Sequence, residues 1–112
     1  MWDRLNPNEY LGRGDLIESP NARFRLKLET TGELTFSDDM TRSTPWRSGV
    51  TDPHPLRAEM RSSDGVLVCL NTTGGEYWKS ATSGNPMAYV MVTNAGRAAI
   101  YTAQGGEIIG VP

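Results

Sequence analysis

The sequence predicts an all-β fold made of three similar units, and three observations support this. The 112 residues include 12 glycines and 7 prolines, a composition that favours many short strands joined by turns. Apolar and polar residues alternate in three separate segments, which is the pattern of strands with one buried face. The glycines that follow these segments are spaced by 33 and 31 residues, a period that indicates repeat architecture. A chain of this length is expected to form one domain with one core.

Each unit is expected to begin with a β-hairpin. The turn glycines are Gly32, Gly65 and Gly96. Because side chains alternate across a strand, every second residue before each turn is predicted to point inward. These residues are Phe24, Leu26 and Leu28, then Leu56, Ala58 and Met60, then Met87, Tyr89 and Met91. After the glycines the inward positions are predicted to resume with Leu34 and Phe36, Leu67 and Cys69, and Ala98 and Ile100.

A third strand is expected in each unit, within residues 45–49, 77–81 and 107–111. Trp46 and Trp78 lie at matching places, 32 residues apart, and Ile108 is assigned to the matching place in the third unit. One sheet cannot bury its apolar face alone, whereas three sheets facing one another can. These three side chains are therefore expected to meet near a shared axis.

Two short motifs give the chain a family resemblance. One is the Ser-Pro-Asn stretch at residues 19–21, which precedes an aromatic residue and alternating leucines, and the other is Trp-x-Ser at Trp46 and Trp78. Both resemble the bulb-type, or monocot, mannose-binding lectins, and the similarity covers almost the whole chain. The resemblance implies a β-prism II fold with three four-stranded antiparallel sheets and pseudo-three-fold symmetry. It implies a single domain spanning 1–112 with internal repeats at 20–50, 54–82 and 86–112.

In that family each hairpin carries the outward-facing pattern Gln-x-Asp-x-Asn-x-Val-x-Tyr. The amides, the carboxylate and the phenol pair with sugar hydroxyls, and the valine packs on the ring. In the first unit the matching positions are Glu29, Thr31, Glu33, Thr35 and Ser37, which keep none of the five types. Two carboxylates across one turn repel each other, so this place would suit a cation or a basic partner better than mannose.

The second unit keeps part of the pattern. The stretch around its turn is one residue longer than in the first unit, so either Arg61 or Ser62 stands at the Gln position. Asp64 and Val68 match the family's aspartate and valine. The pocket around these two residues is the best candidate for retained sugar binding.

The third unit keeps only Tyr101 of the pattern. Its register is open in the same way, with Val92 or Thr93 at the Gln position and Asn94 or Ala95 at the Asp position, followed by Arg97 and Ala99. Each buried donor left unpaired costs about 1–3 kcal/mol, so weakened or altered mannose binding is expected. The candidate carbohydrate-binding residues of the three units are Glu29, Glu33, Ser62, Asp64, Val68, Thr93, Arg97 and Tyr101.

Two functions stay open on the sequence alone. The first is a non-enzymatic carbohydrate-binding module, and the alternative is a structural or protein-interaction module, such as a surface or decoration subunit of a larger assembly. No catalytic residues, metal site or cofactor are predicted, since Cys69 lies in an apolar run and His54 has no partner pattern. The expected partner is a glycan, of mannose type or another, or a protein surface.

Charge and hydropathy argue against other partners. The net charge is −2 and no basic cluster exists, so nucleic acid is not an expected ligand. No apolar run approaches the about 20 residues of a membrane helix, and the start lacks a signal-peptide pattern, which together predict a soluble chain of undetermined compartment. Family members often exchange their C-terminal strands, and the segment 105–112, two glycines followed by apolar residues, suits such exchange. A homo-oligomer, dimeric or larger, is predicted.

Overall fold

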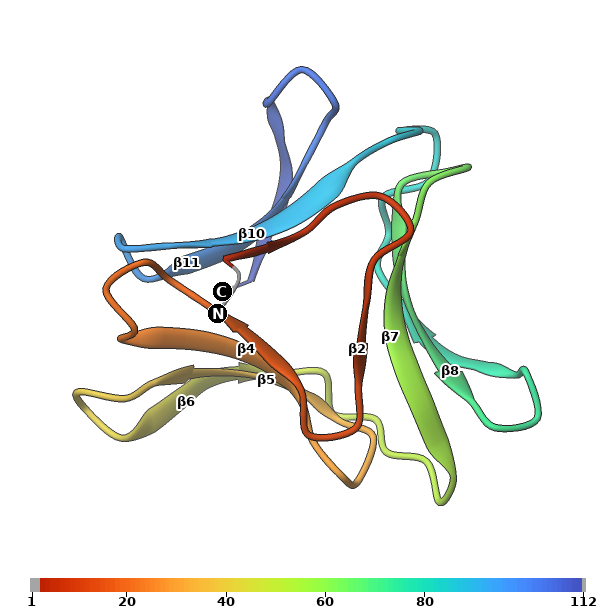
Figure 1. Cartoon of the computed structure of the whole chain (residues 1–112), viewed down its shortest axis with the longest axis horizontal. Coiled ribbons are helices and arrows are strands. Elements are labelled where there is room, and N and C mark those ends of the chain that lie inside the picture. Colours follow the sequence, from red (N-terminus) through yellow and green to blue (C-terminus); the bar gives the residue numbers. More distant parts are fainter. Residues whose placement is uncertain (1–2, 112) are drawn as a thin grey trace.

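Three four-stranded antiparallel sheets surround one axis (Figure 1). The structure is a computed structural model that describes residues 3–111 and contains only strands and loops in this range. Met1, Trp2 and Pro112, which the predicted domain includes, lie outside the described residues. The predicted all-β, three-sheet architecture is confirmed. Between residues 3 and 111 no helix long and apolar enough to cross a membrane was found.

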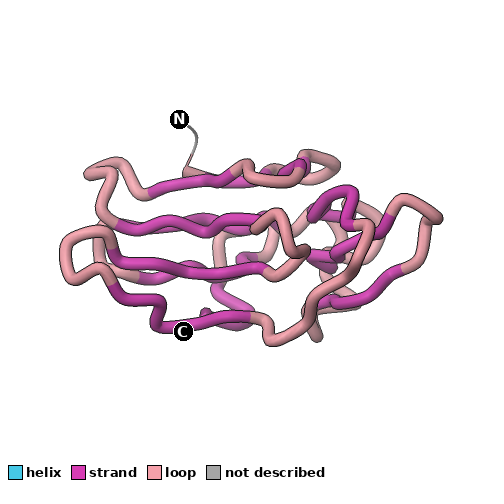
Figure 2. The backbone as a smooth tube through the Cα atoms, turned by 90° about the horizontal axis from the view of Figure 1, so that it is seen from below, coloured by secondary structure: helices cyan, strands magenta, loops and turns pink. Residues whose placement is uncertain are grey.

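Each sheet combines one short N-terminal strand with three strands from a later part of the chain. The first sheet is β3 (Leu16–Glu18), β4 (Phe24–Leu28), β5 (Leu34–Asp38) and β6 (Ser43–Arg47); the second is β2 (Tyr10–Gly12), β7 (Pro55–Arg61), β8 (Val66–Asn71) and β9 (Glu76–Lys79); the third is β1 (Arg4–Leu5), β10 (Tyr89–Thr93), β11 (Arg97–Tyr101) and β12 (Glu107–Val111). The N-terminal segment therefore crosses all three sheets and ties them together. In the side view the N-terminal strand lies at one end of the axis and the C-terminal strand at the other (Figure 2).

The core lies along the axis, where the inward faces of the sheets meet. On β4, Phe24, Leu26 and Leu28 are buried as predicted, and all six predicted inward residues after the turn glycines are buried as well. The rings of Trp46 and Trp78 meet edge to face, with centroids 5.9 Å apart, and pack on this core. The convergence of the two tryptophans near the axis is thus confirmed.

One inward prediction in the second repeat is wrong. Leu56 is 43% exposed, while Ala58 and Met60 are fully buried. The register of β7 against β8 shifts between Pro55 and Arg57. A β-bulge at this point turns Leu56 outward, because the extra residue has no partner opposite it.

The inward prediction for the third repeat is wrong by one residue. Ala88, Val90 and Val92 are buried, whereas Met87 is 53% exposed and Tyr89 and Met91 are half-buried. Val90 pairs with Ile100 and Val92 with Ala98, which places the valines on the inward face. Residues 87–92 are apolar or aromatic at every position, so alternation could not select the buried face, and a one-residue slip reverses every side chain.

Strand register places Ile109 rather than Ile108 at the tryptophan position, although Ile108 does pack against the core as expected and Ile109 is 42% exposed. Trp46 pairs with Phe36 and Trp78 pairs with Cys69. The inward residue Ile100 of the third sheet pairs with Ile109 instead. Each of these pairings contains a register shift, which a count along the sequence does not reveal.

The turn glycines also hold the sheets together. Gly65 has a φ of +75°, and a Cβ on it would overlap the carbonyl oxygen of Asn85, which precedes the third sheet. Gly96 has a φ of +84°, and a Cβ there would lie 2.9 Å from the ring of Phe24 in the first sheet. The glycine period therefore reflects both a left-handed turn and a close contact with the next sheet.

Candidate functional site

The candidate site is the outward side of three hairpins, here named the first face (β4–β5), the second face (β7–β8) and the third face (β10–β11). The pairs Leu28–Leu34, Met60–Leu67 and Val92–Ala98 occupy equivalent places in the three sheets. The residues that follow the last inward residue before each turn are therefore Glu29, Arg61 and Thr93.

The register shows which residue follows the last inward residue on the second and third faces. Arg61 and Thr93, rather than Ser62 and Val92, follow the last inward residue, and Ser62 lies in the turn. Only the second turn is longer by one residue. The expectation that the third turn is longer too is wrong, because it counted from Met91 instead of the buried Val92.

On the first face both glutamates have basic neighbours in their own sheet. The Lys27 ammonium lies 3.7 Å from Glu29, and the Arg47 guanidinium lies 3.8 Å from Glu33. The backbone N–H of Gly49 also donates to Glu33 at 3.0 Å. Among the described residues no group of three or more His, Cys, Asp or Glu side chains could hold a metal ion. The two carboxylates are thus engaged within the protein rather than facing each other alone.

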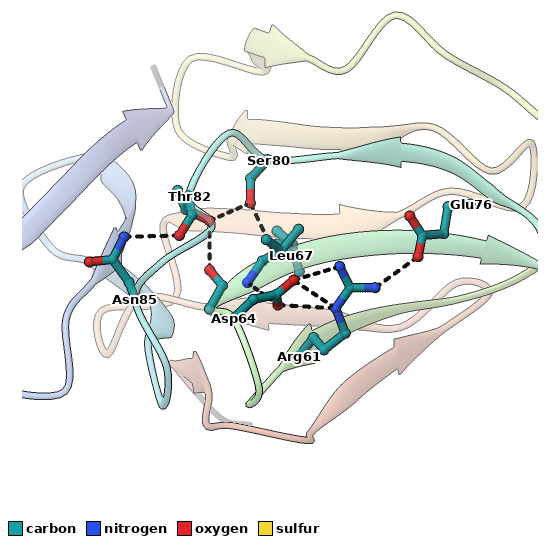
Figure 3. Close-up of polar contacts among 9 residues, drawn as sticks. Arg61, Asp64, Leu67, Glu76, Ser80, Thr82 and Asn85 are labelled. Atoms are coloured by element: carbon teal, nitrogen blue, oxygen red, sulfur yellow. Dashed lines mark hydrogen bonds and ion pairs between the residues drawn. The ribbon is translucent and has the colours of Figure 1, made fainter.

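On the second face Arg61 joins two carboxylates (Figure 3). Its Nε and Nη2 donate to Asp64 at 3.0 and 2.8 Å, and its Nη1 donates to Glu76 on β9 at 2.8 Å. The hydrogen bonds from Arg61 lower the pKa of Asp64, and the backbone N–H of Val66 acts in the same direction although burial opposes it. The carboxylate that was expected to pair with sugar hydroxyls is therefore already paired.

The loop after β9 stabilises the turn of the second face through hydrogen bonds of Ser80 and Thr82 (Figure 3). Thr82 is buried and its hydroxyl donates to the carbonyl of Gly65 at 2.6 Å. The hydroxyl of Ser80 accepts from the N–H of Leu67 at 2.9 Å, and the side-chain amide of Asn85 donates to the carbonyl of Thr82 at 2.9 Å. These bonds fix the turn beside Asp64. Val68, the other predicted residue of this face, is 1% exposed.

The third face carries two stacked tyrosines. The rings of Tyr89 and Tyr101 are 5.4 Å apart at an angle of 20°, and the guanidinium of Arg4 lies 5.3 Å from the centre of the Tyr89 ring. Arg97 donates from Nε to Glu107 on β12 at 2.8 Å. Thr93 is half-buried and its hydroxyl donates to the Arg97 carbonyl at 3.4 Å. Burial raises the pKa of Tyr101, with a further contribution from Glu107.

All three faces share an ionic link from the hairpin to the last strand of the sheet. The links are Glu33–Arg47, Arg61–Glu76 and Arg97–Glu107. Glu76 and Glu107 are equivalent, because they pair with Leu70 and Tyr101 at matching places. Exposed pairs of this kind contribute about 0–1 kcal/mol each, but they use the charged donors and acceptors that a bound sugar would need.

Sequence reasoning missed half of these groups. Glu107, Arg47 and Tyr89 were not among the candidate residues, although each contacts one that was. Glu76 was not a candidate either, and it contacts Arg61, which was considered only as an alternative to Ser62. Tyr89 could have been recognised as outward-facing if Val90 and Val92 had been taken as the inward residues, because side chains alternate across a strand. The glutamates on β9 and β12 stand two residues before Trp78 and Ile109, which is a recognisable common place.

No protein-family model matches the chain, and a search of curated proteins found no relative. Comparison with solved structures gave similar folds. A lectin from Marasmius oreades matches with a TM-score of 0.85 at 22% identity, over 99% of this chain and 91% of that one. A monomeric monocot mannose-binding lectin from Gastrodia elata matches with a TM-score of 0.82 at 22% identity, over 96% and 94%. The mannose-specific agglutinin of snowdrop, Galanthus nivalis, in complex with methyl-α-D-mannoside, matches with a TM-score of 0.75 at 18% identity, over 90% of each chain. The chain therefore has the β-prism II fold of these lectins, as its sequence motifs predict.

Proposed function

We propose that this protein is a non-enzymatic, lectin-like carbohydrate-binding module with weakened or altered mannose specificity. The observation that carries the proposal is the match over at least 90% of both chains to lectins, one of them solved with a mannoside. The altered specificity follows from the side chains, because ion pairs replace most of the amides and hydroxyls that a mannose pocket requires.

The third face is the main site in this proposal. Tyr101 and Thr93 offer two hydroxyls, and the stacked tyrosine rings offer an apolar surface of the kind that suits sugar rings. Burial and nearby charges act on the Tyr101 hydroxyl, with no hydrogen bond from another described residue, so it can pair with a ligand. Arg97 can donate to a sugar oxygen with the N–H groups that Glu107 does not use.

The first and second faces are secondary sites in this proposal. A sugar on the second face would have to displace Arg61 from Asp64, and Ser62 would contribute only from the turn. Val68 is buried and could only pack beneath a bound sugar, without hydrogen-bonding it. On the first face Glu29 and Glu33 lack donors altogether when ionised. Weaker binding than on the third face is the expected result for both.

The test is a glycan array with the folded wild type and three matched variants. Tyr101→Phe removes one hydroxyl from the third face, Ser37→Ala removes the hydroxyl at the equivalent place of the first face, and Asp64→Ala probes the second face. Loss of one ligand hydrogen bond corresponds to about a fivefold weaker signal. We expect this loss for Tyr101→Phe only. Loss in Asp64→Ala alone would move the site to the second face, and a silent array with folded protein would reject the proposal.

A second candidate function is a structural or protein-interaction module that keeps the fold without binding sugar. The observation that favours it is the ionic link on every face, which leaves a charged surface in place of three pockets. Such a surface suits a partner with complementary charge. A silent glycan array together with a salt-sensitive complex, isolated from the native source and mapped by cross-linking to these faces, would support it. Glycan binding weakened by Tyr101→Phe would contradict it.

We further propose that the protein forms homo-oligomers by exchange of β12. Within the chain β12 pairs with β11, from Ala98–Val111 to Tyr101–Glu107, and the same pairs could form between two protomers. Gly105, with a φ of +92°, lies in the turn that would have to open. Light scattering should then give at least twice the chain mass. A mass of one chain, the state described for the Gastrodia elata lectin, would contradict the exchange.

A further inference from the structure

A cavity of about 250 Å³ lies on the axis, at the end where the third strands converge. All three sheets line it, and the residues that matter most are Leu26, Leu34, Trp46, Leu67, Trp78 and Ile109. Most of the lining is apolar, but the exposed Lys79 also borders the cavity and Ile109 is 42% exposed, so the cavity is open to solvent on one side. The hydroxyl of Ser80, which also borders it, is engaged with Leu67 and Thr82.

The cavity results from a break in the three-fold pattern. Trp46 and Trp78 occupy equivalent inward positions in the first and second sheets, but the register places Ile109 at this position in the third. The indole rings of Trp46 and Trp78 fill the parts of the cavity beside the first and second sheets, with centroids 5.9 Å apart and an angle of 66° between the planes. Ile109 is smaller than tryptophan and leaves the part beside the third sheet incompletely filled.

The chemistry of the lining selects the ligand. Apolar cavities bind apolar molecules, and an engineered cavity of about 150 Å³ is known to take benzene. Aromatic rings prefer edge-to-face contact with other aromatic rings, worth about 0.5–1.5 kcal/mol beyond their burial. Trp46 and Trp78 already make such a contact and are half-buried, so their remaining edges and faces border the cavity.

From this geometry we infer that the axial cavity is a binding site for one small, neutral aromatic molecule of about the size of indole. The ligand takes the place that a third tryptophan would occupy. The site lies inside the prism, whereas the three faces lie outside, so it does not depend on the proposed carbohydrate binding. Occupation adds packing contacts to all three sheets and therefore stabilises the fold.

The test uses indole and 5-fluoroindole with the full-length chain. Indole at ten times its Kd should raise the Tm of the wild type by about 6 °C. The ¹⁹F resonance of 5-fluoroindole should broaden, and methyl resonances of Leu26, Leu34 and Leu67 should shift on addition of indole. These methyl shifts locate the ligand without any substitution.

Two variants separate the cavity from the surface. Ile109→Trp fills the part beside the third sheet, so the free protein should gain Tm and its affinity for indole should fall at least tenfold. Met40→Trp adds the same side chain at a position that is 73% exposed and does not line the cavity, so it should keep wild-type affinity.

Three results would overturn the inference. They are the absence of a Tm shift and of ¹⁹F broadening in the wild type at millimolar probe, wild-type affinity in Ile109→Trp, and methyl shifts confined to residues away from the axis. A chain that self-associates in the wild type, dissociates in Ile109→Trp and does not bind indole would show that a second copy fills the cavity, which also overturns it.

Discussion

Replacement of Gly65 by alanine should destabilise the protein far more than the same change at Gly74. Both glycines lie in turns and have positive φ values, +75° and +86°. A Cβ at Gly74 would have no neighbour within 4 Å, whereas a Cβ at Gly65 would overlap the carbonyl group of Asn85. The pair therefore separates backbone strain from contact between sheets.

The magnitude follows from these two terms. An L-residue in the left-handed region costs about 1–2 kcal/mol, partly offset by about 0.4–1 kcal/mol because alanine restricts the unfolded chain. This gives about 1 kcal/mol for Gly74→Ala. At Gly65 the backbone around Asn85 must also move. This strains two hydrogen bonds, from the Asn85 N–H to the Asp64 carbonyl at 3.1 Å and from the Met87 N–H to the Ser62 carbonyl at 2.9 Å. Two such bonds at about 1 kcal/mol each bring the total for Gly65→Ala to about 3 kcal/mol.

Urea unfolding followed by tryptophan fluorescence measures both values, and a thermal scan should show a Tm lower by about 12 °C for Gly65→Ala and about 4 °C for Gly74→Ala. The m-values should equal that of the wild type, which would show that the denatured state is unchanged. Equal losses for the two variants would refute the reasoning, since they would mean that the contact with Asn85 contributes nothing.

Three further predictions concern buried groups and ion pairs. Met60→Ala should cost about 2–5 kcal/mol of unfolding free energy, whereas Leu56→Ala should cost less than 1 kcal/mol because Leu56 is 43% exposed; similar losses in urea unfolding would contradict the bulge. Cys69 is fully buried and burial raises the pKa of its thiol to about 12, so a thiol reagent at pH 8 should label it only after unfolding; rapid labelling of the native protein would contradict this burial. Asp64 has a lowered pKa because of Arg61, so its contribution to stability is present above the unfolded pKa of about 3.9 and is lost as the pH falls below it. Arg61→Gln should therefore raise the Asp64 pKa in an NMR titration and flatten the loss of stability below pH 4, and an unchanged titration would show that Arg61 does not hold the carboxylate.

Local sequence signals predicted the fold well, because each of them is tied to a single physical requirement. The glycine period follows from turns with positive φ that also touch the next sheet, as at Gly65 and Gly96. The inward positions of β4 were predictable because polar residues separate Phe24, Leu26 and Leu28. The same rule failed on β10, where Val90 and Met91 are both apolar and only the pairing of Val90 with Ile100 decides which of them is buried.

The candidate site was predictable only in part, because its contacts depend on register across strands. Asp64 and Tyr101 were named as candidates because the family pattern runs within a single hairpin, the second for Asp64 and the third for Tyr101. The partners of the ion pairs lie on another strand, as with Glu76 on β9, which contacts Arg61 on β7. A register shift within the pairing of each sheet's last strand hides their alignment. The same register shift explains why counting along the sequence assigned Ile108, rather than Ile109, to the tryptophan position.

The ion pairs also set the order in which the faces can admit a ligand. Arg97 and Glu107 are 46% and 38% exposed, so water already competes with their pairing and its replacement by a sugar costs little. Arg61 is 30% exposed and holds two carboxylates, so opening the second face leaves Asp64 and Glu76 both without their cation. A neutral sugar cannot replace that charge, whereas on the third face the proposed sugar could bind beside an intact pair, next to a Tyr101 hydroxyl that no other described residue hydrogen-bonds. If the proposed carbohydrate binding holds, we therefore expect it on the third face, even though the second face keeps more of the family's residue types.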